Sequence, residues 1–220
     1  MTTGMRVIAI DGPAGSGKST VAKALAARLG LEYLDTGAMY SSVTFAALRR
    51  GIDPSEPEQV ARIVEDIQLE VRADGVTVDG VDASIEIRGP EVSRAVSIVA
   101  ANPAVRAEMV RRQREWVVAH DGGVLEGRDI GTVVFPDAEL KVYLTADPEV
   151  RAQRRSKEVT DLDYETVAAD LARRDALDQG RDVSPLTEAA DAFLVDTTGM
   201  TVEQIIDTIA EQLGHGRIDG

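Results

Sequence analysis

Gly12-Pro13-Ala14-Gly15-Ser16-Gly17-Lys18-Ser19 follows directly after the apolar run 7–10. It matches the pattern G-x-x-x-x-G-K-S/T, with a predicted strand before it and a predicted helix after it, in which Val21, Leu25 and Leu29 recur at helical spacing. The glycines let successive backbone N–H groups converge on a polyphosphate, and the N-terminus of the helix adds a partial positive charge. The sequence therefore predicts a site for a nucleoside triphosphate.

Two side chains at the end of this stretch point to phosphate and metal chemistry. Lys18 supplies a full positive charge to the phosphates. Ser19 can place its hydroxyl on the Mg²⁺ that accompanies them, so Mg²⁺ is the predicted cofactor and Ser19 its predicted protein ligand.

Composition narrows the class of protein. The chain has 220 residues, which suits one α/β domain, and its 44% apolar residues suffice for a core. It contains no cysteine, which excludes disulfides, thiolate zinc sites and cysteine nucleophiles. With no cysteine, a cytoplasmic location is the default expectation. The segment before Asp11 is too short and too soon charged for a signal peptide.

The formal net charge of −14 argues against a nucleic acid polymer as partner, since that would require a basic face. A small anionic substrate requires only a local cluster of arginines. No stretch approaches the ~20 apolar residues of a membrane span. Since there is no heptad repeat, we expect a monomer. The expected partners are small molecules, and we expect binding to neither nucleic acid nor membrane.

Short apolar runs alternate with helical patterns along the chain, which predicts an α/β fold with a doubly wound, five-stranded parallel sheet and helices on both faces. The predicted strands are 7–10, 32–34, 124–126, 140–144 and 193–195. The predicted helices after the first are 38–50, 57–67, 103–119, 148–157, 164–177 and 202–213.

Residues 68–88 break this alternation. Val76 and Val78, then Ile85 and Ile87, recur with a period of two between Asp-Gly turns, which predicts a small antiparallel unit. Together with residues 90–101, this unit is either a lobe that covers a second substrate or a surface hairpin without a role.

Other motifs decide among the classes of nucleotide-binding protein. Asn102 is the only asparagine and Pro103 follows it, so the N-K-x-D element of Ras-like GTPases is absent. The run 124–129 places Gly and Arg before its Asp and so departs from the Mg²⁺-ordering strand of motor ATPases. A kinase for a small molecule remains.

A kinase must exclude water from the transferring phosphoryl group. Arg151, Arg154 and Arg155 share one face of a predicted helix, and a polar stretch, 156–163, follows. These residues predict a lid whose guanidinium groups offset phosphate charge; the alternative is an ordinary solvated helix face.

The arginines of this sequence favour a phosphate, rather than a hydroxyl, as the group that accepts the transferred phosphoryl group. A hydroxyl needs a base, whereas a phosphate is already an anion and needs only cations to offset repulsion. Arg106, Arg128, Arg174 and Arg181 suit the second case. The histidines, His120 and His215, lie near segment ends and are expected at the surface.

At several motifs the chain resembles the bacterial cytidylate kinases. The resemblance spans residues 7–206, and its most specific part is the run through Arg128 and Asp129. The motifs that carry it are residues 12–20, Asp35-Thr36-Gly37-Ala38-Met39-Tyr40, the run 126–136, and Arg181 with 183–186.

The resemblance implies a P-loop kinase fold with an insert at about 63–102 that binds the nucleoside monophosphate and a helical lid at about 150–182, within one domain, 1–220. It implies transfer of the γ-phosphate of ATP to CMP or dCMP, in pyrimidine nucleotide metabolism. Lys18, Arg128 and Arg181 would be catalytic. Gly12, Pro13, Ala14, Gly15, Ser16, Gly17, Lys18, Ser19, Thr20 and Arg154 would bind ATP.

The acceptor residues are also implied by the resemblance. Ser97, Arg106 and Asp129 would read the cytosine, since Asp129 can accept a hydrogen bond from the exocyclic amine and uracil has a carbonyl there. Arg174 and Asp178 would hold the pentose, and Arg128 and Arg181 the acceptor phosphate. The implied CMP site is Asp35, Thr36, Ser97, Arg106, Arg128, Asp129, Arg174, Asp178 and Arg181.

One position departs from the family pattern. Arginine follows the motif tyrosine in the family, whereas this chain has Ser41, which removes a cation and a bidentate donor from the acceptor phosphate.

Two alternative functions remain open at this point: a kinase of the adenylate or shikimate type, and a nucleotide-dependent switch with negligible turnover.

Overall fold

The computed structural model describes residues 4–158 and 162–215 and is built on a parallel sheet of five strands in the order β2-β6-β1-β7-β8. The central strand is β1, whose apolar residues are buried on both faces, as expected for a parallel sheet. The predicted α/β class and all five predicted strands are confirmed. The strands are β1 (Arg6–Asp11), β2 (Tyr33–Asp35), β6 (Gly122–Gly127), β7 (Leu140–Thr145) and β8 (Phe193–Asp196).

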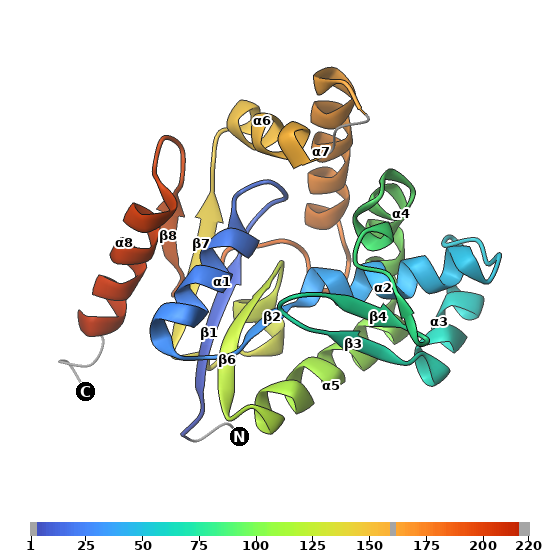
Figure 1. Ribbon diagram of the computed structural model, residues 1–220, viewed down its shortest axis with the longest axis horizontal. Coiled ribbons are helices and arrows are strands. Elements are labelled where there is room, and N and C mark those ends of the chain that lie inside the picture. The colour runs from blue at the N-terminus through green and yellow to red at the C-terminus, as the bar shows by residue number, and fades with distance from the viewer. Residues whose placement is uncertain (1–3, 159–161, 216–220) are drawn as a thin grey trace.

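Helices cover both faces of this sheet, as predicted (Figure 1). Ile8 and Ile10 pack on one face with α1 (Lys18–Leu29) and α8 (Val202–His215). Val7 and Ala9 pack on the other face within a larger core. The helices of that second core are α2 (Thr36–Arg49), α3 (Pro57–Asp66), α4 (Pro90–Ala101) and α5 (Pro103–Ala119).

The helix predicted from Ala38 begins two residues earlier, at Thr36. Asp35 is its N-cap: the carboxylate accepts the backbone N–H of Ala38 at 2.8 Å, which satisfies a donor that the first turn leaves unpaired. The prediction missed this cap because Asp35 also ends a strand. Consequently β2 passes into α2 without a loop and brings Asp35 and Thr36 to the edge of the sheet.

The predicted antiparallel unit is present as a sheet of three short strands, β3 (Leu69–Val71), β4 (Val76–Val78) and β5 (Val81–Asp82). The prediction of a strand through Ile85 and Ile87 is wrong, since 86–88 forms a single 3₁₀ turn, η1 (Glu86–Arg88). The Asp82 carboxylate accepts the backbone N–H of Ser84 at 3.0 Å and its hydroxyl at 2.6 Å, which turns the chain out of the sheet.

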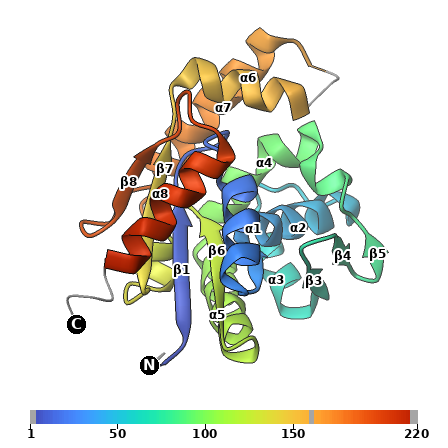
Figure 2. The same cartoon turned by 60° about the vertical axis from the view of Figure 1, so that its left-hand side comes forward.

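Helices α6 (Pro148–Glu158) and α7 (Tyr164–Gln179) lie over the carboxyl ends of β1 and β7 (Figures 1 and 2). Ala14 of the phosphate loop, 12–19, packs with Ala152 of α6 and with Leu171 of α7. Residues 159–161 of the predicted polar lid stretch lie outside the described residues. Among the helices described, none has both the length and the apolar character needed to cross a membrane.

Candidate active site

A cavity of about 1070 Å³ opens at the carboxyl ends of the parallel strands. Ligands of open α/β sheets bind in this position, because loops from neighbouring strands converge there. All predicted site residues line the cavity except Gly12 and Pro13. The predicted residues on its wall are Ala14, Gly15, Ser16, Gly17, Lys18, Ser19, Thr20, Asp35, Thr36, Ser97, Arg106, Arg128, Asp129, Arg154, Arg174, Asp178 and Arg181.

Gly12 and Pro13 shape the phosphate loop from behind. Gly12 has a φ of 147°, and a Cβ there would lie 2.1 Å from the carbonyl oxygen of Leu144 in β7. Only glycine therefore lets the loop leave β1 so close to its neighbour. The carbonyl of Pro13 accepts a hydrogen bond from Nζ of Lys18 at 2.7 Å, which holds the ammonium within the loop.

The loop is also held from α7. Asp175 accepts the backbone N–H of Ala14 at 3.3 Å and pairs with Arg151, whose Nη1 donates to the carbonyl of Ala14 at 3.1 Å. The prediction that Arg151 is a lid arginine directed at phosphate is therefore not supported by these contacts: its guanidinium ties α6 and α7 to the backbone of the loop.

The other two predicted lid arginines line the cavity. Nη1 of Arg154 donates to the hydroxyl of Thr197 at 2.8 Å, and Nη2 donates to the Thr197 carbonyl at 2.8 Å. Arg155 pairs with Glu158 at 2.9 Å and reaches the hydroxyl of Ser93 in α4 at 3.4 Å. Nη1 of Arg154 also donates to the carbonyl of Ser16 at 3.4 Å, so Arg154 lies beside the phosphate loop, whereas Arg155 lies between α6 and α4.

Asp178 of α7 joins the predicted acceptor residues. Its carboxylate accepts Nε of Arg128 at 2.9 Å and the hydroxyl of Ser97 at 2.8 Å, and it also pairs with Arg181. Burial acts to raise the pKa of Asp178, but Arg128, Arg181 and Arg174 outweigh burial and hold that pKa below its usual value. One carboxylate from the predicted lid therefore binds three separate parts of the chain: the residue that follows β6, helix α4 and the segment after α7.

The remaining charge in this cluster is positive and poorly compensated. Burial, and then repulsion by Arg128, lower the pKa of Arg174 to about 10. Burial and Arg128 likewise lower the pKa of Lys18 to about 7. Among the described residues, the buried Nε atoms of Arg174 and Arg181 have no hydrogen-bond acceptor. Buried donors without partners and crowded cations favour an anionic ligand at this place.

A second buried charge pair lies farther along the cavity wall. Arg106 of α5 pairs with Asp129, which follows β6, and both side chains are almost fully buried. The guanidinium carbon of Arg106 lies 5.6 Å from the centre of the Tyr40 ring. Such a pair offers donor and acceptor atoms beside an aromatic face, which is the chemistry that a planar heterocycle with an amine and a carbonyl requires.

The start of α2 forms another part of the wall. The hydroxyl of Thr36 donates to the carbonyl of Glu126 at 2.6 Å, which holds the start of α2 against the end of β6. Asp35 pairs with Arg88 of η1 at 3.7 Å. Ser41, one turn into α2, is half-buried and lines the same cavity. The departure from the family pattern at Ser41 therefore lies at the site.

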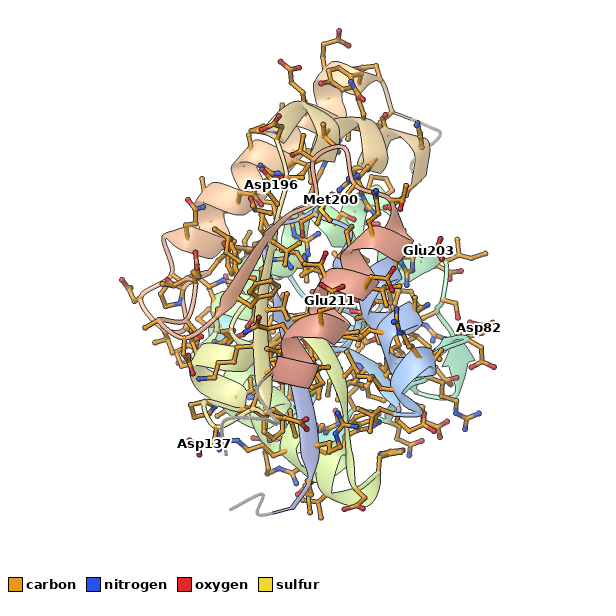
Figure 3. The ribbon with its side chains drawn as sticks, turned by 90° about the vertical axis from the view of Figure 1, so that its left-hand side faces the viewer. Asp82, Asp137, Asp196, Met200, Glu203 and Glu211 are labelled. Atoms are coloured by element: carbon orange, nitrogen blue, oxygen red, sulfur yellow. The ribbon has the colours of Figure 1, made fainter. Side chains whose placement is uncertain are left out.

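Sequence reasoning missed one end of the cavity. Met200 lies in the loop between β8 and α8, as Figure 3 shows. It lines the cavity together with neighbouring residues and with the outer side of α1. No motif marks these residues, because a wall that only contacts a ligand can be built from many residue types. The missed residues at this end are Lys23, Ala24, Met200, Thr201, Val202 and Ile205.

His120 is exposed, as predicted, and stacks on Trp116 with ring centres 4.3 Å apart. The side chain of His215 lies outside the described residues. The acidic residues labelled in Figure 3 come from separate elements, including β5, β8 and α8, so the net negative charge is spread over the molecule.

Comparisons with known proteins identify the family of this chain. The family model described as cytidylate kinase matches residues 8–215. The cytidylate kinase of Mycolicibacterium paratuberculosis is 50% identical over 213 residues, covering 93% of this chain and 93% of that protein. The cytidylate kinase of Streptomyces griseus is 49% identical over 217 residues, covering 96% of this chain and 94% of that protein.

Among solved structures, an uncharacterized protein from Eubacterium ventriosum superimposes with a TM-score of 0.57 at 12% identity, covering 96% of this chain and 99% of that chain. At that identity the likeness shows the fold alone. The family model and the sequence relatives extend over nearly the whole chain, including the phosphate loop, the arginine cluster and the Arg106–Asp129 pair. The chain belongs to the cytidylate kinase family.

Proposed function

We propose that this protein transfers the γ-phosphoryl group of ATP to CMP or dCMP and releases ADP with CDP or dCDP. The observation that carries the proposal is that the phosphate loop, the arginines around Asp178 and the buried Arg106–Asp129 pair line one cavity. A donor site, a cationic centre and a polar pocket for a base therefore follow one another along the same wall.

The donor end takes the ATP phosphates on the backbone N–H groups of residues 15–19 and on Lys18, since the N–H of Ala14 is already held by Asp175. Within the described ranges, no group of three or more His, Asp or Glu side chains forms a metal site of its own. A single hydroxyl from Ser19 fits an ion that keeps water and phosphate ligands and arrives with the nucleotide. When bound, Mg²⁺ neutralises charge on the β- and γ-phosphates.

The acceptor end takes the pyrimidine nucleotide. Asp129 accepts a hydrogen bond from the exocyclic amine of cytosine, while Arg106 donates to its ring acceptors. Ser97 does the same once its hydroxyl turns from Asp178 to the base. Uracil would place a carbonyl against a buried carboxylate, so UMP is disfavoured. Arg174 and Asp178 hold the pentose, with Asp35 and Thr36 beside it at the start of α2.

The chemical step requires no base. An oxygen of the CMP phosphate, already ionised, attacks the γ-phosphorus in line, and the bond to the bridging oxygen of ADP breaks with its electron pair remaining on ADP. Arg128 and Arg181 reduce the repulsion between the two anions, and Lys18 reaches the transferring group. Arg154 contacts ATP from α6.

We assign residues 63–102 to the insert that binds the monophosphate and residues 150–182 to the lid that excludes water. The hydrogen bond that Ser97 in α4 donates to Asp178 in α7 supports this assignment, since it joins insert and lid across the cavity. The protein is proposed to act as a cytoplasmic monomer.

A panel of acceptors tests the proposal. Purified protein with Mg-ATP should phosphorylate CMP and dCMP, with UMP at least about tenfold slower in kcat/KM because a hydrogen bond to a buried charged group is lost. AMP and shikimate should not be used. The measurement is ADP release in a coupled assay. Preference for AMP or shikimate would instead support the other kinase types, and no ADP release with any acceptor would support a switch.

Replacement of Asp129 tests the base-reading role. Asp129→Ala should lower kcat/KM for CMP by about tenfold to a hundredfold, because the cytosine amine loses its acceptor and Arg106 its partner. The KM for ATP should change by less than about threefold, since the donor end is untouched. Asp137→Ala, in an exposed loop before β7, is the control. An equal loss for both nucleotides would show that Asp129 does not read the base.

Ser41→Arg should raise kcat/KM for CMP by about tenfold, since a charge-assisted hydrogen bond to the acceptor phosphate is added. Ser41→Met adds a long side chain with neither charge nor hydrogen-bond donor and should leave kcat/KM near the wild-type value. Steady-state kinetics with varied CMP provide the measurement. No gain in the arginine variant would mean that the other arginines already saturate this phosphate.

Lys18→Met should abolish turnover while raising the melting temperature of the ligand-free protein at pH 7. The pKa of Lys18 is lowered to about 7 in the folded protein, so the unfolded chain binds the proton of this lysine more tightly than the folded chain does. Keeping the lysine charged in the folded state therefore lowers the free energy of unfolding at pH 7. This difference in melting temperature should shrink as the pH rises from 7 towards 10. Differential scanning fluorimetry measures it, and retained turnover in the variant would refute the role of Lys18.

A further inference from the structure

Asp11 is a buried carboxylate that none of the steps above uses. It is the last residue of β1, its exposed fraction is 5%, and it is not among the residues that line the cavity. Its two oxygens accept successive backbone N–H groups, from Ile130 at 2.9 Å and from Gly131 at 2.8 Å. These residues begin η2 (Ile130–Val134), a single wide turn that follows Asp129 directly.

The backbone of Asp11 does not need this side chain to stay in place. Asp11 pairs with Gly127 of β6 on one side and with Tyr143 of β7 on the other, so the end of β1 is held in the middle of the sheet. The turn 130–134 lies outside the sheet. The carboxylate therefore holds the turn, and the turn carries Asp129 at its start.

A charge at this position is costly. Burial raises the pKa of Asp11 to about 6, although the two N–H groups act to lower it. The charged groups that act on it are Asp129, which opposes ionisation of Asp11, and Lys18, which favours it. An apolar residue here would avoid the cost of burying a charge beside a second carboxylate. An apolar residue, however, could not accept the N–H groups of Ile130 and Gly131, which the carboxylate of Asp11 does.

We propose that Asp11 is the positioning residue that fixes Asp129, and through it Arg106, in the geometry that distinguishes cytosine from uracil. The proposal rests on the proposed function, because it assigns to Asp129 the reading of the base. Asp11 precedes Gly12, so one residue both ends the strand that carries the donor loop and holds the turn that carries the acceptor pocket.

The test is the Asp11→Asn variant, which keeps one acceptor oxygen but turns an amide donor towards the second N–H. We expect KM for CMP to rise by about tenfold and the preference for CMP over UMP in kcat/KM to fall by a similar factor, as expected for a lost bond to a charged acceptor. The Kd for ATP in the absence of CMP should stay within about twofold of wild type, because the pairing of β1 is intact.

Arg114 of α5 supplies a matched control, because it binds the same turn from another element. Its Nε donates to the carbonyl of Val134 and its Nη2 to that of Val133, each at 3.0 Å, so it holds the last residues of η2, whereas Asp11 holds the first two. Arg114→Ala should leave KM for CMP and the CMP preference unchanged. If Asp11→Asn shifts the Kd for ATP as much as KM for CMP, or if both variants shift the CMP preference equally, Asp11 is only structural and the proposal is wrong.

A second measurement needs neither mutation nor activity. In the wild-type protein, hydrogen exchange followed by NMR should show the amides of Ile130 and Gly131 protected at pH 7.5, with protection factors that fall as the pH drops below about 6, the pKa of Asp11. Protection independent of pH there would overturn the proposal even if Asp11→Asn failed to fold. Wild-type protein that lacks CMP kinase activity in the same assays would instead refute the proposed function.

Discussion

The charge balance around Asp178 is the constraint on which the rest of the site depends. Several guanidinium groups lie within one partly closed space and repel one another, and a single buried carboxylate holds two of them and a hydroxyl in place. Without that carboxylate the cations would separate towards water. With it, the cluster keeps more positive charge than the described carboxylates compensate, and this surplus is what two phosphate groups require when they are brought together.

The parallel sheet makes this cluster possible. The carboxyl ends of β1 and β6 are adjacent, so the donor loop that follows β1 and the residues that follow β6 begin at the same edge. Helices α6 and α7 then lie over that edge. Helix α7 supplies both Asp175, which binds the loop, and Asp178, which binds the arginines. Asp175 and Asp178, three residues apart on α7, thus connect the donor and acceptor ends of the cavity.

The fold and most of the residues that line the cavity could be predicted from the sequence. Phosphate chemistry restricts the residue types of the loop strongly, and the resemblance to the cytidylate kinases implied the acceptor residues. The glycines of 12–17, Lys18 and the arginines after β6 can hardly be replaced by other side chains without losing their function. The exception within the fold is the stretch through Ile85 and Ile87, where the period of two was broken by the Asp82–Ser84 turn, a local hydrogen bond that hydrophobic spacing does not record. The cavity wall around Met200 left no signal for a different reason: many residue types can build it. The role of Arg151 in holding the loop depends on Asp175 across the fold, which spacing along a helix cannot reveal.

A crystal structure with CMP and a non-hydrolysable ATP analogue tests the central claim most directly. We predict that the CMP phosphate lies within hydrogen-bond distance of Arg128 and Arg181, in line with the γ-phosphate held by the loop 12–19. A CMP phosphate bound away from these arginines, with the cluster around Asp178 left as it is, would contradict the account.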